Sequence, residues 1–367
     1  MNLAPRITNL ARRPRGFVLV LALFVIVLLT ALLVRFNYAA RVNLESSAGF
    51  LDSQQALQAA RSGLQVALAA LTRNPDPQAN PLLANLLRGA RLHLPDVACN
   101  LLLSPENGKL NVNRLTTPAG AIDRPAVERL LRLIDLYNSR RTGPALSYEC
   151  VPALIDWTDP DDQPTVLPFV QQTNRGAESD YYQRLQPPYR CANQPLSHLN
   201  ELLLVKGITS QAFLGPDRPA VVPPADSRFT ALAAGPNTAP YPAPAPNGPF
   251  ALRDCLTVYG DGRINLNAAP APVLLALHQD LTPTAVQAIL ARRQQRPFAA
   301  AAELLNVPGV TADVAAALAG VLTIGAADPH YTVLAQGCAA GAAVTITAVI
   351  RLRTSGQPPQ ILWYQES

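Results

Sequence analysis

The longest apolar run of the chain covers residues 17–34. Fifteen of these 18 residues are Leu, Ile, Val or Phe, and none is charged. At about 1.5 Å per residue, such a helix reaches about 27 Å, close to the thickness of a bilayer's hydrocarbon core. The pattern therefore predicts a transmembrane helix. Leucines at helical spacing continue to Leu71 without a proline, which predicts an amphipathic stalk ending at the Asn-Pro-Asp-Pro segment, residues 74–77.

Beyond the stalk, two regions alternate apolar and polar residues as strands do. Two alternating runs within residues 99–115 flank Asn107-Gly108, and this dipeptide predicts a β-hairpin because both residues tolerate positive φ. Three C-terminal runs predict strands over residues 331–335, 343–353 and 360–364.

The middle of the chain has helical periodicity. Helices are predicted over residues 125–137, 153–157, 196–204, 271–277, 284–293, 300–305 and 314–322. A proline-rich segment, residues 215–249, interrupts them and predicts an extended surface loop, because proline suits neither helix nor sheet.

Two pairs of segments repeat in this helical region. GKLNVN at 108–113 matches GRINLN at 262–267, and ELLLVKGIT at 201–209 matches ELLNVPGVT at 303–311. Such self-similarity predicts two related small helical units, each ending in a tight turn at a glycine.

The distribution of charge predicts how the chain is oriented across the membrane. The net charge is +5 over 367 residues, and the leader of residues 1–16 holds four arginines and no acidic residue, which leaves +1 for the rest. A charge of +1 is no nucleic-acid footprint by itself. The positive-inside rule places the leader in the cytoplasm and the remainder across the membrane.

The junction Arg15-Gly16-Phe17 resembles the processing site of the type IV prepilin family. The resemblance implies that a membrane peptidase cuts between Gly16 and Phe17 and methylates the new terminus; a plain signal anchor is the alternative. Most of the family carry Glu at mature position five, but here that position is Leu21. This departure resembles the minor pseudopilin K class of type II secretion systems.

An acidic stretch is the strongest candidate for a metal site. Its carboxylates belong to Asp156, Asp159, Asp161, Asp162, Glu178 and Asp180, on segments rich in Pro and Gly. Calcium takes six to eight hard oxygen ligands, which closely spaced carboxylates can supply. No EF-hand spacing is present, so a solvated acidic loop is the alternative.

Residues 155–275 resemble protein K of type II secretion in the order and spacing of LIDWTDPDD, GAESDYY, PPYRCANQPLSHLNELLLVKGIT and LTVYGDGRINLNAAPAPVL. The resemblance implies a helical head that binds calcium in such loops. Carried over, the ligands are Asp159, Asp161, Asp162, Glu178 and Asp180, whereas Asp156 can cap a turn instead.

Five cysteines in an exported domain predict disulfides with one thiol left over. Cys150 and Cys191 flank the acidic stretch, and a bridge between them is predicted because closing this loop would reduce the entropy of the unfolded chain. Cys255 and Cys338 could link two β segments, which would leave Cys99 spare.

Candidate catalytic chemistry is sparse. The sequence has no Gly-x-Ser-x-Gly, Cys-x-x-Cys or phosphate loop, and its four histidines stand apart. An enzyme is therefore not expected, unless folding gathers distant residues. The two Val-x-Gly turns resemble helix-hairpin-helix units, but only Lys206 adds a cation beside one of them, so a sterile-alpha-motif-like (SAM-like) packing of helices is favoured over DNA binding.

These features predict an α+β fold with a transmembrane and stalk helix, a pilin-like head with an antiparallel sheet, and a large inserted helical domain. The expected segments are the leader (1–16), the transmembrane helix (17–34), the stalk and first strands (35–118), the inserted helical domain with the first SAM-like unit (119–214), the proline-rich loop (215–249), a strand with the second unit (250–325) and the C-terminal strands (326–367).

The resemblance implies a minor pseudopilin of the bacterial inner membrane with a periplasmic head. It would cap the tip of the type II secretion pseudopilus and nucleate its assembly for export of folded proteins. Implied partners are the I- and J-class minor pseudopilins, the major pseudopilin, the prepilin peptidase and the inner-membrane platform, with exported substrate as a further candidate and no nucleic acid. The alternative function is a membrane-anchored DNA-uptake protein.

Overall fold

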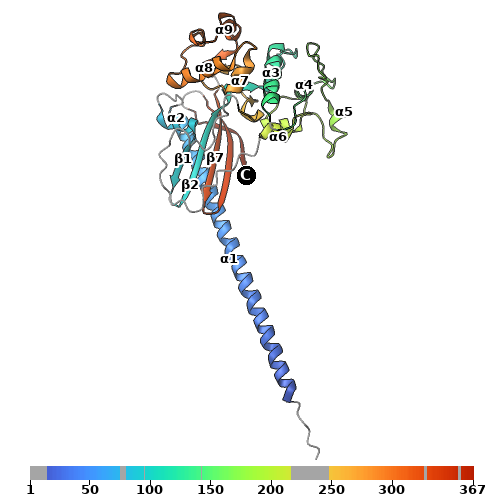
Figure 1. Cartoon of the computed structure of the whole chain (residues 1–367), viewed down its shortest axis with the longest axis vertical. Coiled ribbons are helices and arrows are strands. Elements are labelled where there is room, and N and C mark those ends of the chain that lie inside the picture. Colours follow the sequence, from blue (N-terminus) through green and yellow to red (C-terminus); the bar gives the residue numbers. More distant parts are fainter. Residues whose placement is uncertain are drawn as a thin grey trace, which may run out of the picture.

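The computed structural model describes residues 15–74, 80–94, 96–141, 143–215, 248–325, 329–353 and 357–367, with side chains from Val18 onward except that of Leu94. Nearly all of the leader, and residues 216–247 of the predicted proline-rich loop, lie outside the described residues. The described parts form a long helix, a sheet packed on the C-terminal third of that helix, and a group of helices at the far end of the sheet (Figure 1).

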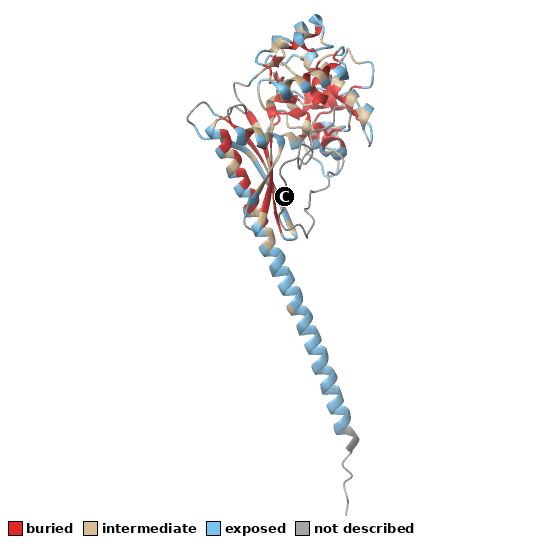
Figure 2. Ribbon diagram, turned by 60° about the vertical axis from the view of Figure 1, so that its left-hand side comes forward, coloured by how far each residue is buried: buried red, intermediate tan, exposed pale blue. Residues whose placement is uncertain are grey.

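Helix α1 (Arg15–Arg73) confirms the predicted stalk and its end before Pro75. Among the described residues it is the one helix long and apolar enough to cross a membrane, and the side chains of its apolar part are exposed (Figure 2). From Ala56 onward one face is buried, and that face is rich in alanine, which lets the helix approach the sheet closely.

The sheet is antiparallel, as predicted, with strand order β1-β2-β7-β8-β9. Its strands are β1 (Ala90–Leu94), β2 (Val97–Pro105), β7 (His330–Ala339), β8 (Ala342–Arg351) and β9 (Gln360–Glu366). Alternate residues of β2, β7 and β8 form one apolar core with α1 and the short helix α2 (Pro81–Arg88). Neighbouring strands β2 and β7 are far apart in sequence, so everything between them is inserted at one end of the sheet.

The hairpin predicted around Asn107-Gly108 is wrong. After β2 the chain makes a short 3-10 turn, η1 (Glu106–Gly108), and leaves the sheet. The next strand, β3 (Leu110–Asn111), pairs in parallel with β4 (Leu256–Thr257) and not with β2. The partner of β2 on that side is β7, because burial of β3 in the helical core outweighs the local turn preference of Asn-Gly.

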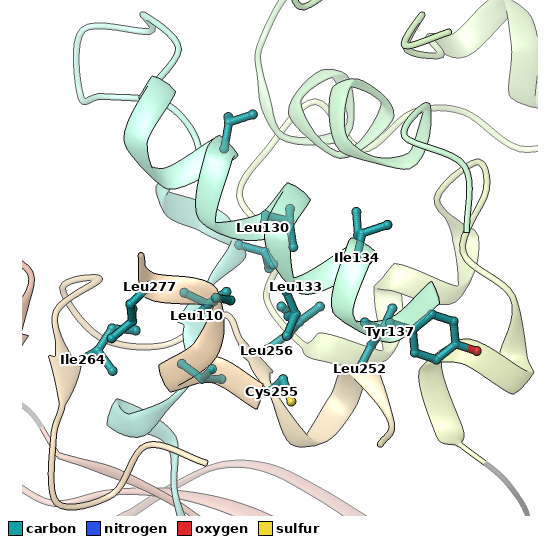
Figure 3. Close-up of a cluster of buried hydrophobic side chains, with 14 of the residues drawn as sticks. Leu110, Leu130, Leu133, Ile134, Tyr137, Leu252, Cys255, Leu256, Ile264 and Leu277 are labelled. Carbon is teal, nitrogen blue, oxygen red and sulfur yellow. The ribbon is translucent and has the colours of Figure 1, made fainter. Parts of the chain in front are cut away.

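The inserted helical region has a separate apolar core (Figure 2). Side chains from α3, β3 and β4 meet in it, including Leu133, Leu110 and Leu256 (Figure 3). Its further elements are η2 (Val112–Arg114), α3 (Arg124–Arg140), α4 (Cys150–Thr158), α5 (Ser179–Tyr182), η3 (Leu199–Leu204), α6 (Ser210–Leu214), η4 (Leu252–Asp254), β5 (Ile264–Asn265), α7 (Ala271–Leu277), α8 (Pro283–Gln295), η5 (Ala301–Asn306), α9 (Ala312–Leu318) and β6 (Leu322–Thr323).

The predicted helices agree with this element list except in three places. Residues 196–204 and 300–305 contain 3-10 segments, η3 and η5, in place of α-helices. The last predicted helix, 314–322, ends at Leu318, because Leu322 belongs to β6, which pairs in parallel with β5.

The predicted internal repeat is confirmed by matching hydrogen bonds. The amide of Asn113 donates to Leu196 O at 2.9 Å, and its Oδ1 accepts from Leu196 N at 2.9 Å. In the second unit, Asn267 makes the same pair of 2.9 Å bonds with the backbone of Phe298. Each asparagine therefore ties the strand that opens its unit to the segment before the 3-10 turn.

The glycine turns of the two units are equivalent as well. Gly207 has φ +83° and Gly309 has φ +85°, a region that L side chains rarely adopt. A Cβ built on Gly207 would lie 3.2 Å from the Cβ of Cys150 at the start of α4, and one on Gly309 would lie 3.2 Å from the Cβ of Ala285 in α8. Each glycine lets its turn pack against the first turn of a helix, so α4 and α8 correspond.

Candidate metal centre

The acidic stretch is an insertion into the first of the two units. In the second unit only Arg296 and Pro297 separate α8 from Phe298, whereas residues 159–195 separate α4 from the equivalent Leu196. The longer connection carries every predicted metal ligand. Because the second unit packs without such a segment, the extra residues are not required for the helical arrangement itself.

Three of the predicted ligands come together in space. Carboxylate oxygens of Asp159, Asp161 and Glu178 all lie within 4.8 Å of one another. Asp159 follows the C-terminal end of α4, Asp161 lies in the loop beyond it, and Glu178 precedes α5. Glu178 is buried, Asp159 is half-buried and Asp161 is exposed, so the cluster lies at the surface with one wall inside the protein.

Several buried oxygens around the cluster have no hydrogen-bond partner among the described residues. They are Asp159 Oδ1, both carboxylate oxygens of Glu178, Asp156 Oδ2 and Asn193 Oδ1. Burying a polar oxygen without a partner costs about 1–3 kcal/mol, and native proteins avoid this unless a water or ion satisfies the atom. These five acceptors, four of which are carboxylate oxygens, fit a hard cation.

The electrostatics of the cluster agree with this interpretation. Burial, together with the charges of Asp156 and Asp159, raises the pKa of Glu178 to about 8. Burial and the charges of Asp156 and Asp161 raise the pKa of Asp159 to about 6. Crowded carboxylates repel one another, and a bound cation would remove that repulsion.

Asp156 is buried near the C-terminal end of α4, where it holds the acidic loop and does not cap a turn. Its Oδ1 accepts a 2.9 Å hydrogen bond from Thr165 N, which ties the acidic loop to α4. Its free Oδ2 lies against Gly176, where an added Cβ would be only 2.0 Å away. Burial is the largest cause of the raised pKa of Asp156. The negative charge of Asp156 in turn raises the pKa of both Asp159 and Glu178.

The other two predicted ligands are placed differently. Asp162 accepts a 3.3 Å hydrogen bond from the amide of Asn193, which also donates to Asp161 O at 3.0 Å. Asp180 is exposed in α5 and is not part of the converging group. Sequence reasoning missed Asn193, because it lies 31 residues beyond Asp162 and only folding brings them together.

The disulfides predicted from spacing do not form in the structure, in which all five cysteines are free thiols. The thiol of Cys191 donates to Asp156 O at 3.4 Å, near the C-terminal end of α4, whereas Cys150 begins that helix. Six residues of helix span about 9 Å, beyond the Cα separation of about 4.4–6.8 Å that a disulfide allows. Cys255 is buried in the helical core and Cys338 is in the sheet, so their predicted link is absent as well.

Aromatic side chains form the inner wall beside the cluster. Trp157 packs edge-on against Tyr182, with ring centroids 5.1 Å apart, and Tyr182 stacks on Tyr189 at 5.2 Å. Trp157 and Tyr182 are almost fully buried. Because Trp157 directly follows Asp156, its fluorescence should report changes at the acidic cluster.

Comparison with known proteins matches both units to one family. The family models for type II secretion system protein K match residues 108–215 and 264–325, which begin at the two repeated strand motifs. The type II secretion system protein K of Klebsiella pneumoniae is 26% identical over 208 residues, which cover 55% of this chain and 60% of that protein. The Pectobacterium carotovorum subsp. carotovorum protein K is 41% identical over 61 residues, 17% of this chain and 16% of the relative.

The fold matches a solved structure over most of its length. A crystal structure of the GspK-GspI-GspJ complex from the enterotoxigenic Escherichia coli type 2 secretion system contains a chain that aligns with a TM-score of 0.56 and 20% identity. The alignment covers 89% of this chain and 99% of that one. The two matches follow the same order as the two structural units, so residues 108–215 and 264–325 are similar to the type II secretion system protein K family in sequence, and the fold agrees with this similarity.

Proposed function

We propose that this protein is a minor pseudopilin that caps the tip of the type II secretion pseudopilus and nucleates its assembly. The observation that carries the proposal is the position of the helical units, which lie at the end of the sheet opposite the free part of α1 (Figure 1). Subunits stacked through their stalk helices leave little room for such a bulk above the sheet. A subunit of this shape fits the end of a fibre, with its stalk on the next subunit below.

Leu21 supports the same position. A carboxylate inside a bilayer costs a few kcal/mol and persists only with a partner. The prepilin pattern places a glutamate at mature position five to meet a neighbour's free amino terminus, and this chain has leucine there. A subunit at the tip has no neighbour that needs this carboxylate.

The expected partners are the I- and J-class minor pseudopilins, since the fold neighbour was solved as a GspK-GspI-GspJ complex. The major pseudopilin, the inner-membrane platform and exported substrate are further proposed contacts. We propose a mechanical role without catalysis. His198 and His278 serve as caps, their Nδ1 atoms accepting from Asn200 N and Asp280 N.

Immunogold electron microscopy of pseudopili from cells that overproduce the major pseudopilin tests the tip position. An antibody against the helical units should label one end of each fibre and nothing along its length, because a single cap terminates the assembly. Regular labelling along the shaft would contradict capping. Fibres that form in normal number without this protein would contradict nucleation.

The prepilin junction predicts the mature N-terminus. Gly16 and Phe17 lie in the first turn of α1. We expect mass spectrometry to find N-methylated Phe17 as the first residue in cells with a prepilin peptidase, with the head periplasmic and the removed leader cytoplasmic. Cells without the peptidase, and a Gly16→Asp variant, should retain the leader. An intact Met1 in every strain would reduce the segment to a signal anchor.

We propose calcium as the ligand of the acidic cluster. Asp159, Asp161 and Glu178 would hold the ion, with Asn193 Oδ1 and Asp162 close by. The five unpartnered buried oxygens are hard donors of the kind calcium prefers. The cation would neutralise the crowded carboxylates and join the end of α4 to the start of α5.

DNA uptake, the alternative function, gains little support from the glycine turns. Lys206 is engaged within the protein, donating to Glu149 Oε1 and Arg175 O at 3.2 Å each. The second turn carries Asn306 and Pro308 at the corresponding place. Backbone amides bind a DNA phosphate only weakly when no free lysine or arginine side chain lies beside them.

A further inference from the structure

A cavity of about 240 Å³ lies where the sheet and the two helical units meet. Its lining comes from the segment after β2, from the link between β4 and β5, and from Thr323, Gly325 and His330 at the end of β6 and the start of β7. Ligand sites occur preferentially at such junctions between structural units. None of the metal-centre residues lines it.

The two copies of the internal repeat meet at this cavity and differ there in one informative position. The first copy begins Glu-Asn-Gly-Lys at residues 106–109, and the second begins Gly-Asp-Gly-Arg at residues 260–263. Lys109 therefore corresponds to Arg263, and Glu106 corresponds to Gly260. All four residues line the cavity.

In the first copy the cation has its own carboxylate. Lys109 Nζ lies 2.5 Å from Glu106 Oε1, which also accepts a 2.7 Å hydrogen bond from the hydroxyl of Thr332. Both Lys109 and Glu106 are more than nine-tenths buried. This ion pair is complete without an external group.

In the second copy the carboxylate is missing. Gly260 stands where Glu106 would be, and the guanidinium of Arg263 makes no ion pair or hydrogen bond within the described part of the chain. Asp261 Oδ1 is used by the loop itself, since it accepts a 3.0 Å hydrogen bond from Arg263 N. The cavity is therefore lined by an arginine that has glycine where the first copy has the paired glutamate.

A second arginine lines the same cavity, and both arginines are also exposed to solvent. Arg114 likewise has no ion-pair or hydrogen-bond partner among the described residues. The stem of Arg114 packs on Gly262, where an added Cβ would lie 3.2 Å from Arg114 Cγ. Gly262 has φ +89°, so it both turns the loop and leaves room for the arginine.

We propose that this cavity binds an oxyanion, a carboxylate or a phosphate, through Arg114 and Arg263. A guanidinium presents paired N–H donors that match the two oxygens of either group. The bound anion takes the place that Glu106 occupies in the first copy and links the two helical units beside the sheet. The site is independent of calcium and of the position in the fibre.

Isothermal titration calorimetry of the full chain in a non-ionic detergent tests the proposal. The probes are sodium succinate for a carboxylate and sodium methyl phosphate for a phosphate, each compared with sodium chloride at equal ionic strength. We expect at least one probe to bind with a Kd of millimolar or tighter. The probe that binds more tightly identifies the source of the oxyanion.

Matched variants localise the binding. Arg263→Gln should weaken it at least tenfold, and Arg114→Gln combined with Arg263→Gln should abolish it. Arg296→Gln removes an exposed arginine of the second unit away from the cavity and should leave the Kd unchanged. Thermal melts in chloride should show that every variant is folded. Heats equal to those of chloride for both probes, or an unchanged Kd in the folded double variant, would overturn the proposal.

Discussion

Chelating calcium at pH 8 lowers the melting temperature of the full chain in detergent by about 5–10 °C. The physical reason is that the ion binds the folded acidic cluster but not the unfolded chain. At a calcium concentration about 100 times its Kd, this contributes about 2.7 kcal/mol. In a domain of this size, about 1 kcal/mol shifts the melting temperature by about 2–4 °C. Differential scanning calorimetry in calcium and in EDTA measures the difference.

Two variants separate a metal site from an ordinary acidic loop. Glu178→Gln removes a buried carboxylate with two unpartnered oxygens, so it should lose the response to calcium. In EDTA it should melt no lower than the unmodified protein, because the substitution also removes charge repulsion. Asp180→Asn is the matched control, since Asp180 is exposed and outside the converging group. Its calcium response should be unchanged.

The effect of calcium should grow with pH. The pKa of Glu178 is raised to about 8 and that of Asp159 to about 6, both above the values of the unfolded chain. Without metal, the folded protein binds more protons than the unfolded chain, so its stability falls as pH rises from about 5 to 8. Calcium requires the ionised carboxylates and cancels this loss. The melting curves with and without calcium should nearly coincide at pH 5 and separate by pH 8.

Fluorescence gives an independent measurement of the same event. The chain has two tryptophans, and Trp363→Phe leaves Trp157 beside the cluster as the sole emitter. A phenyl ring retains a stacking surface for His198, which lies 3.8 Å from Trp363 between ring centroids. Calcium should change the Trp157 emission in a saturable way. Equal melting temperatures in calcium and EDTA at pH 8, with unchanged emission, would remove calcium from the proposal.

Gly337→Ala lowers the free energy of unfolding of the sheet and stalk by about 3 kcal/mol or more. A Cβ at Gly337 would lie 1.8 Å from the backbone oxygen of Ala56 and 2.7 Å from the backbone nitrogen of Ala60. Neither backbone atom can rotate away, so α1 must move off β7 and open the alanine-lined interface. Overpacking a core costs about 1–3 kcal/mol and occasionally more, and backbone overlap belongs to the costly cases.

Gly341→Ala is the control for this substitution. Gly341 lies in the turn between β7 and β8, and a Cβ there would meet nothing within 4 Å. Chemical denaturation should place Gly341→Ala within about 0.5 kcal/mol of the unmodified protein. Equal stability of Gly337→Ala and Gly341→Ala would show that α1 does not pack on β7 as closely as described.

Much of the fold could be predicted because its signals are local. The apolar run, the stalk and its proline-marked end depend on residues close in sequence, and α1 confirms them. The repeated motifs also identified the two units correctly. Asn113 and Asn267 make equivalent hydrogen bonds, and Gly207 and Gly309 form equivalent turns. The hairpin at Asn107-Gly108 failed because a local turn preference was outweighed by long-range pairing of β2 with β7.

The candidate metal site was likewise predicted only in part from the sequence. The sequence identified a run of carboxylates, but it could not separate Asp161, which joins the converging group, from Asp180, which does not. It also predicted a Cys150–Cys191 bridge from spacing alone. In the structure Cys150 begins α4, whereas the thiol of Cys191 lies near the other end of that helix, at Asp156 O. Spacing along a chain measures loop length, and ligands and disulfides require a fixed distance in space.

The sequence by itself determined the membrane-length helix, the stalk, the α+β class, the duplication and the acidic segment. Each of these follows from hydrophobic period, composition or direct repetition. Only the tertiary structure decided which carboxylates meet, that Asn193 joins them, and that Arg114 and Arg263 share a cavity with a complete Lys109–Glu106 pair. Several of these residues are far apart in sequence, such as Asp162 and Asn193, which are 31 positions apart, and long-range packing of two cores sets their geometry.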